Sequence, residues 1–117
     1  MVIAGLTFMS VMSFTDNNTA NKSKKFVTET FKVDGCCGEC KERIEQALDI
    51  KGIRYASWEV STHILTVTYN TKKITIQEIH NTIAGVGHDT DLVKAPDNIY
   101  NALPDCCQYR GGHSCNH

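Results

Sequence analysis

Three cysteines gather within five residues, at positions 36–40 of this 117-residue chain. Cys37 and Cys40 form a Cys-x-x-Cys pair, whose sulfurs can hold one soft ion between them. Cys36 comes directly before the pair, and glycines at 35 and 38 allow the loop to make tight or positive-φ turns. A helix begins here, and its first N–H groups favour the thiolate form that binds metal. The stretch therefore predicts a soft-metal loop.

The same pair has two other interpretations. One is a structural disulfide formed in an oxidising compartment. The other is the redox pair of a thiol-disulfide oxidoreductase, but thioredoxin-like folds have a different element order and a proline facing the pair. Both prolines, Pro96 and Pro104, lie outside the expected core. Two thiolates suit low-coordinate ions, whereas structural zinc takes four ligands. We therefore expect Cu(I), or another soft heavy-metal ion such as Hg(II).

Two further residues near the pair are candidates for the site. Cys36 is either a third ligand or a small buried side chain, and packing is favoured because adjacent side chains point apart. His88 follows Gly87 in a loop that enters the last expected strand, at the same end of the sheet as the thiols. An imidazole at this position can bind metal, donate a hydrogen bond to a thiolate, or face solvent.

A second group of potential ligands lies near the C-terminus: Cys106, Cys107, His113, Cys115 and His117. Cys/His-rich tracts commonly bind metal, so we expect a second, weaker metal site here. In an extended segment the last three of these side chains share one side. The alternatives are a disulfide between the two adjacent cysteines or pairing with another chain. The sequence leaves open whether this tail completes the first site or binds metal independently.

The apolar pattern predicts the elements that carry these residues. Alternating apolar residues indicate strands, and apolar residues three or four apart indicate helices. The expected order is a strand at 26–33, a helix to about residue 49, a hairpin of 53–60 and 64–69, a helix at 75–84 and a strand at 88–94. This order predicts an α+β, ferredoxin-like βαββαβ sandwich, with a four-stranded antiparallel sheet and two helices on one face. A helical turn follows at 98–103, and we expect residues 105–117 to be flexible.

The capping signals and the composition add to this picture. Thr75 is a predicted N-cap, and Glu78 is the matching capping-box acid. With 12 Lys and Arg against 13 Asp and Glu, the chain has no strong field that would attract nucleic acid or anionic lipid. The sequence shows no Ser/His/Asp set, paired carboxylates or phosphate-binding loop, so we do not expect an enzyme.

The first residues indicate export. Positions 2–14 are mostly apolar and carry no charge, but they are too few to span a bilayer, which needs about 20. They resemble the apolar part of a signal peptide, although a floppy apolar tail is the alternative. The expected organisation is a signal peptide at 1–20, a linker at 21–25, a metal-binding domain at 26–96 and a Cys/His-rich tail at 97–117. We expect a periplasmic or otherwise exported protein, without stable membrane insertion once the signal is removed.

With this loop on this frame, the chain resembles the heavy-metal-associated domain, the small module of copper chaperones, copper-pump N-terminal domains and periplasmic mercury-binding proteins. The resemblance is carried by Val33-Asp34-Gly35, the Cys37–Cys40 pair, the Ile44/Leu48 helix face, Gly52-Ile53 with Ala56, Val67-Thr68-Tyr69, and Ile79/Ile83 before Gly87.

The resemblance implies that Cys37 and Cys40 bind one Cu(I), Hg(II) or similar ion near-linearly, and that the residue at His88 tunes the site. It also implies a metal-transporting membrane protein or another metal carrier as the partner, and a monomer or a metal-bridged dimer. One departure stands out. The family usually has Gly-Met-x-Cys-x-x-Cys, whereas here Gly35 is followed by Cys36 and directly by Cys37. Cys36 then replaces the methionine that packs beneath the loop.

Overall fold

Three antiparallel strands form the sheet in the computed structural model, which describes residues 25–112. They are β1 (Phe26–Lys32), β2 (Ile53–Trp58) and β3 (Ile64–Asn70), in the order β1-β3-β2. The register opposes Phe31 to Leu65 and Thr28 to Thr68. Because side chains alternate along a strand, the first pair faces the core side and the second pair joins its hydroxyl groups on the other face, 2.7 Å apart.

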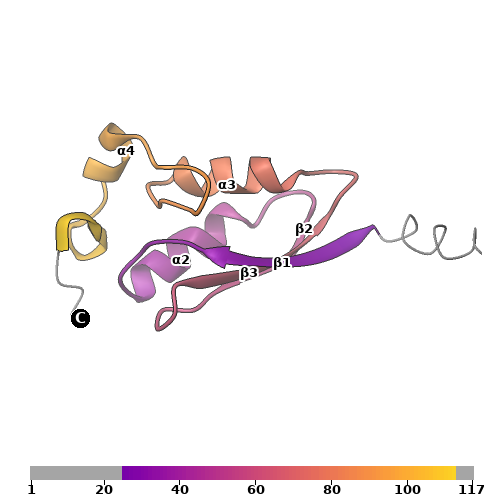
Figure 1. Ribbon diagram of the computed structural model, residues 1–117, viewed down its shortest axis with the longest axis horizontal. Helices are drawn as coiled ribbons and strands as arrows, with labels where there is room; N and C mark the ends of the chain where they lie inside the picture. Colours follow the sequence, from indigo (N-terminus) through magenta and orange to yellow (C-terminus); the bar gives the residue numbers. More distant parts are fainter. Residues whose placement is uncertain (1–24, 113–117) are drawn as a thin grey trace, which may run out of the picture.

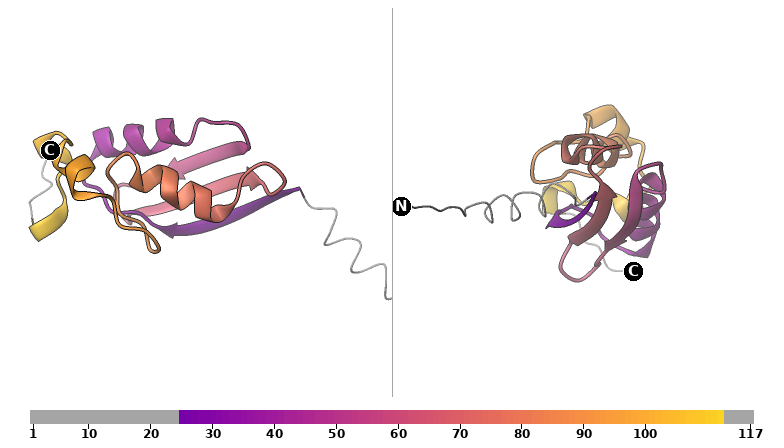
Figure 2. Two further views of the ribbon diagram at one scale, coloured as in Figure 1. Left: turned by 90° about the horizontal axis from the view of Figure 1, so that it is seen from above. Right: turned by 90° about the vertical axis from the view of Figure 1, so that its right-hand side faces the viewer.

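Two helices cover one face of this sheet (Figure 1, Figure 2). They are α2 (Gly38–Ala47) and α3 (Ile76–Ala84). The predicted capping box is confirmed, since the Thr75 hydroxyl accepts from the Glu78 N–H while the Glu78 carboxylate accepts from the Thr75 N–H. The core lies between the helices and the sheet. Its fully buried members are Val33, Cys40, Ile44, Leu48, Trp58, Leu65, Val67, Ile79 and Ile83.

The expected four-stranded sheet is not what the described residues form. Of the strand predicted at 88–94, the structure keeps one isolated bridge, Val33 to Thr90. The Thr90 hydroxyl accepts from the N–H groups of Leu92 and Val93, and the Thr90 N–H donates to the Val93 carbonyl. These local bonds close a turn, because a threonine side chain can compete with a neighbouring strand for backbone groups. The α+β architecture with two helices on one face remains.

The chain then forms an ordered arm, residues 97–112, where a flexible tail was expected from 105 onward. The arm consists of α4 (Asp97–Asn101) and two 3-10 turns, η1 (Asp105–Cys107) and η2 (Arg110–Gly112). Figure 1 shows the arm at the end of the domain where α2 begins. The prediction of flexibility was therefore wrong for residues 105–112. Across residues 25–112, no helix has both the length and the apolar character needed to cross a membrane.

Candidate metal centre

The start of α2 positions Cys37 and Cys40. Cys37 is the N-cap residue, with an extended backbone (φ −149°), and its side chain is half-buried. Cys40 lies in the first turn and is completely buried. The backbone N–H of Cys36 donates to the Cys40 sulfur at 3.3 Å. A donor aimed at a buried sulfur stabilises negative charge on it, as a metal-binding thiolate requires.

Trp58 forms the floor under this loop. Its ring is fully buried, and its indole N–H donates to the Val33 carbonyl at 2.9 Å. A Cβ atom built on Gly35 would lie 3.0 Å from the ring atom Cη2. Gly35 is therefore required for close approach of the loop to the ring, whereas the sequence had suggested conformational freedom. Gly38 simply opens α2 and faces open space.

The arm brings a third thiol to the pair. Cys107, in η1, is completely buried, and its sulfur forms one group with those of Cys37 and Cys40. All three sulfur atoms lie within 4.8 Å of one another. Sequence analysis named each of these residues as a candidate ligand but could not bring them together. The structure brings the three together.

Cys106 lies beside this group. Its thiol donates to the Glu39 carboxylate at 2.9 Å, and its sulfur is 3.9 Å from that of Cys107. Glu39, Cys106 and Cys107 form a second, overlapping group of potential ligands within the same 4.8 Å limit. The Cys106 carbonyl also accepts a weak hydrogen bond from the Cys37 thiol at 3.7 Å. With 3.9 Å between their sulfur atoms, Cys106 and Cys107 do not form the disulfide considered between them.

The protonation of the thiols differs from one to the next. Burial acts to raise the pKa of Cys37, but hydrogen bonds from the backbone N–H groups of Cys40 and Glu39 outweigh it, and the pKa lies below the usual thiol value. Burial raises the pKa of Cys107 to about 11, against the opposing effect of Arg43. The hydrogen bond to Glu39 is the main reason that the pKa of Cys106 rises to about 12. At neutral pH, Cys37 is thus the most readily ionised of the three.

Arg43 is a neighbour that sequence analysis missed. Its guanidinium Nη1 donates to the Cys107 sulfur at 3.1 Å. The signal was available, because Arg43 follows Cys40 by three residues and so lies one turn further along the same side of α2. It could not be interpreted without knowing that Cys107 packs there. A fixed positive charge beside clustered thiols favours their ionised, metal-binding forms.

The other predicted site residues take different places. Cys36 is 6% exposed and is disulfide-bonded, so its sulfur is engaged rather than available as a thiolate. His113, Cys115 and His117 lie outside the described residues.

His88 is fully buried beneath the loop and does not belong to the sulfur group. Its Nδ1–H donates to the Asp34 carbonyl at 2.8 Å, and its ring stacks on Tyr109 with 5.6 Å between centroids. Among residues 25–112, nothing hydrogen-bonds its Nε2 atom. Burial lowers the pKa of His88 to about 4, so the ring is neutral at physiological pH. In this position it holds the backbone that leads into Gly35 and the thiols.

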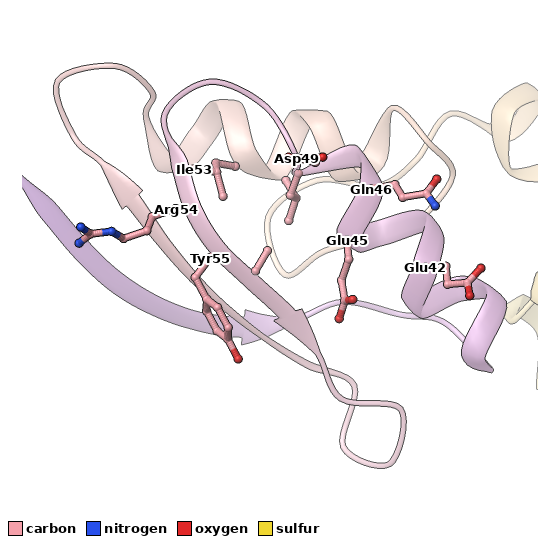
Figure 3. Close-up of a pocket in the computed structure, with 9 residues that line it drawn as sticks. Glu42, Glu45, Gln46, Asp49, Ile53, Arg54 and Tyr55 are labelled. Carbon is pink, nitrogen blue, oxygen red and sulfur yellow. The ribbon is translucent and has the colours of Figure 1, made fainter.

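Among the surface hollows that flank α2, two differ in how they lie relative to the thiols. One, drawn in Figure 3, lies between α2 and β2, away from the thiols, and includes Glu42, Glu45 and Arg54 in its lining. Glu45 is held there by the N–H of Trp58 at 2.9 Å. The other hollow opens beside the thiols and is lined by Cys37, Gly38, Glu39, Glu42 and Cys106. An incoming ligand would reach the sulfur group from this second side.

Comparison with known proteins places this geometry in context. A curated zinc-transporting ATPase of Synechocystis sp. (strain ATCC 27184 / PCC 6803 / Kazusa) is 38% identical over 69 residues, which are 57% of this chain and 10% of the ATPase. The chain thus spans about a tenth of the length of that relative.

Solved structures show the same fold. The CopZ metallochaperone superposes with a TM-score of 0.53 at 29% identity, covering 55% of this chain and 98% of that one. A mutant described as ZiaAN sub gives 0.50 at 36% identity, covering 61% and 99%. Oxidised MerP from Ralstonia metallidurans CH34 gives 0.53 over 56% and 94%, and at 22% identity this likeness concerns the fold alone. The sequence profile of the heavy-metal-associated domain matches residues 30–89, just over half of the chain. The chain belongs to the heavy-metal-associated domain family.

Proposed function

We propose that this protein binds one soft heavy-metal ion through Cys37 and Cys40 and carries or sequesters it. The observation that carries the proposal is the gathering of free thiols at the start of α2, where the pKa of Cys37 is lowered. Thiolates select soft ions of low coordination number, and Cu(I) is the proposed cargo, with Hg(II) as a second possibility. The likeness to the CopZ metallochaperone supports the proposed role as a metal carrier.

A titration of reduced protein under anaerobic conditions tests the proposal. In the presence of a competing Cu(I) chelator, the protein should retain one ion per chain. Cys37→Ser and Cys40→Ser should each lose that retention, because a single remaining thiolate of the pair competes poorly for a soft ion. Arg54→Met is the control, since Arg54 lies over the Phe26 ring, in another part of the domain from the thiols.

The competing hypothesis is a thiol-disulfide oxidoreductase that uses the same pair. Catalytic reduction of insulin disulfides, together with failure to retain copper, would favour that enzyme and overturn the carrier proposal. We expect the opposite result, because the sequence offers no further catalytic group and the described thiols cluster as ligands do.

Zinc is a third candidate cargo, favoured by the 38% identity to a zinc-transporting ATPase. Zinc prefers four ligands in a tetrahedral arrangement. The described residues offer a compact group of three sulfurs, which suits Cu(I) or Hg(II) better. Competition between Zn(II) and Cu(I) for the same protein decides between them. Displacement of bound Cu(I) by a modest excess of Zn(II) would reverse the assignment.

We further propose that the protein acts in the cell envelope and exchanges its ion with a metal-transporting membrane protein. The apolar residues 2–14 support export, and the family supports such a partner. Cell fractionation and determination of the N-terminus of the native protein test the location. A cytoplasmic protein that retains residues 1–20 would contradict it.

A further inference from the structure

The strongest unassigned feature is the contact between the arm and the thiol loop. Cys107 is 67 residues beyond Cys40 in the sequence, yet its sulfur and those of Cys37 and Cys40 lie within 4.8 Å of one another. The arm begins beyond residues 30–89, where the family match ends. The third thiol is therefore an addition of this chain to the matched domain, and the two-cysteine site of the family does not account for it.

Several contacts fix the arm in place. The Tyr109 hydroxyl donates to the Gly87 carbonyl at 2.7 Å and accepts from the Asp89 N–H at 2.8 Å. Arg110 binds the Asp89 carboxylate with two nitrogen atoms, at 2.7 and 3.2 Å. Leu103 is buried against Gly87, where an added Cβ would approach its side chain to 2.8 Å. These contacts determine where η1 lies, so the position of Cys107 does not depend on a metal.

The surroundings of the Cys107 side chain suit a thiolate that binds a metal ion. The sulfur is fully buried, and the Arg43 guanidinium donates to it at 3.1 Å. Three thiolates around a monovalent or divalent soft ion carry a net negative charge, and burial makes such charge costly unless a cation lies beside it. Arg43 supplies that cation. On the far side of the group, the Cys36 N–H donates to Cys40 and satisfies a second sulfur.

We propose that Cys107 is the third ligand of the bound ion, so that Cys37, Cys40 and Cys107 hold it in a trigonal all-sulfur site. This inference rests on the proposed function, because it concerns the same ion. Binding forms a metal–sulfur bond at Cys107 and releases the thiol proton to solvent, with no change in oxidation state. The ligand class is a soft ion that accepts three thiolates, namely Cu(I) or Hg(II).

X-ray absorption spectroscopy of the loaded full-length protein tests the proposal directly. With one equivalent of Cu(I), wild type and the control Arg54→Met, whose side chain lies over the Phe26 ring away from the thiols, should show three sulfur neighbours at the longer metal–sulfur distance of three-coordinate copper. Cys107→Ser should show two sulfur neighbours at a shorter distance. Two sulfurs in wild type, or identical spectra for wild type and Cys107→Ser, would overturn the proposal.

Affinity measurements give a second and independent readout. Because changes in outer-shell partners alone cost about 10–100-fold in metal affinity, loss of a direct ligand should weaken Cu(I) binding by at least about tenfold. Cys107→Ala should behave as Cys107→Ser does, and urea unfolding of both apo-variants checks that the domain is intact. Affinity unchanged in both folded variants, relative to wild type and Arg54→Met, would also overturn the proposal.

The failure of this inference can be told apart from failure of the proposed function. If wild type retains no soft ion at all, both ideas fall. If wild type retains an ion that Cys37→Ser and Cys40→Ser abolish while Cys107→Ser leaves coordination and affinity unchanged, only the three-sulfur site falls.

Discussion

Gly35 and Gly38 flank Cys36 and Cys37 in the sequence, yet only Gly35 is sterically constrained. A Cβ atom at Gly35 would lie 3.0 Å from the Trp58 ring and 3.2 Å from the Cys40 Cβ atom. The ring cannot give way easily, since it is fully buried and held by its indole N–H. A Cβ atom at Gly38 would meet nothing within 4 Å.

We therefore expect Gly35→Ala to lower the free energy of unfolding by about 1–3 kcal/mol, the usual cost of overpacking. It should also weaken Cu(I) binding, because the loop must move away from the ring. The matched control Gly38→Ala should change the free energy of unfolding by no more than about 0.5 kcal/mol. Urea unfolding of the apo-proteins measures both values, and equal effects of the two substitutions would contradict this account of the loop.

His88 predicts a pH dependence of stability. Its pKa is about 4 in the folded protein and 6.5 for an ordinary histidine. Above pH 6.5 the His88 imidazole is neutral in both the folded and the unfolded protein, so its titration does not affect the free energy of unfolding. As the pH falls toward 4, the imidazole binds a proton in the unfolded chain but not in the folded one. The free energy of unfolding should therefore decrease as the pH falls from 6.5 to 4, and the His88 contribution to this decrease should reach about 3 kcal/mol.

Urea unfolding between pH 7.5 and pH 4 measures this effect as a difference between wild type and His88→Asn, whose amide can still donate to the Asp34 carbonyl. The groups that face His88 include Arg43, Asp89 and Tyr109. Asp89 has a lowered pKa and destabilises in the same direction on protonation, as does the buried His80. Subtraction removes these shared contributions, and parallel pH profiles for the two proteins would contradict the assignment to His88.

The elements that the sequence predicted are those with local signals. The capping box of Thr75 and Glu78 needs only residues three apart, and it begins α3 at the expected place. The predicted fourth strand does not form, because side-chain hydrogen bonds outweigh its apolar pattern. Residues 88–94 alternate enough to predict a strand, but the Thr90 hydroxyl closes a turn, and the Asp89 carboxylate accepts from the Ala95 N–H. Such side-chain bonds compete with a sheet ladder without altering the apolar pattern.

In the candidate site too, the residues that are close in sequence could be predicted to act together, whereas the distant one could not. Cys37 and Cys40 were predicted as a pair because their spacing is local. Cys107 was predicted only as a tail residue, since its position depends on contacts of Tyr109 and Arg110 with the loop at 87–89. The periodicity of apolar residues along a helix or strand does not indicate contacts between residues so distant in sequence. The composition of the tail identified candidate ligands, and the fold determines that Cys107 is the one that meets Cys37 and Cys40 among residues 25–112.

Arg110 is the main electrostatic anchor of the arm. Besides Asp89, it donates to the Ala95 carbonyl at 2.8 Å and lies over the Tyr100 ring, 4.2 Å from its centroid. We expect Arg110→Met to reduce the free energy of unfolding by about 2 kcal/mol, because the partly buried Asp89 carboxylate loses its partner. Cu(I) affinity should fall toward that of Cys107→Ser.

Arg54→Met is the control for this change, since Arg54 lies over the Phe26 ring at the same 4.2 Å but in another part of the domain. It should leave Cu(I) affinity unchanged. Urea unfolding and chelator competition provide the two measurements. An Arg110→Met protein with wild-type affinity would mean that the arm holds Cys107 in place without this anchor.

At the scale of the whole molecule, the arm and the thiol loop together determine how the ion leaves. The hollow lined by Cys37, Gly38, Glu39, Glu42 and Cys106 gives an incoming thiolate a route to the sulfur group. A three-sulfur site must release one of its own thiolates as the acceptor's thiolate binds. Cys107 is the candidate for release, because it belongs to the arm rather than to the helix that holds the other two.

Removing Cys107 should therefore speed transfer as well as weaken binding. We expect Cys107→Ser, and a chain truncated after Leu103, to pass Cu(I) to a dithiol acceptor about tenfold faster than wild type, since affinity losses usually appear in dissociation rates. Stopped-flow mixing of loaded protein with the acceptor measures the rate, and Arg54→Met should match wild type. Slower transfer from Cys107→Ser would mean that this thiol passes the ion outward instead of retaining it, which would reverse the role of the arm.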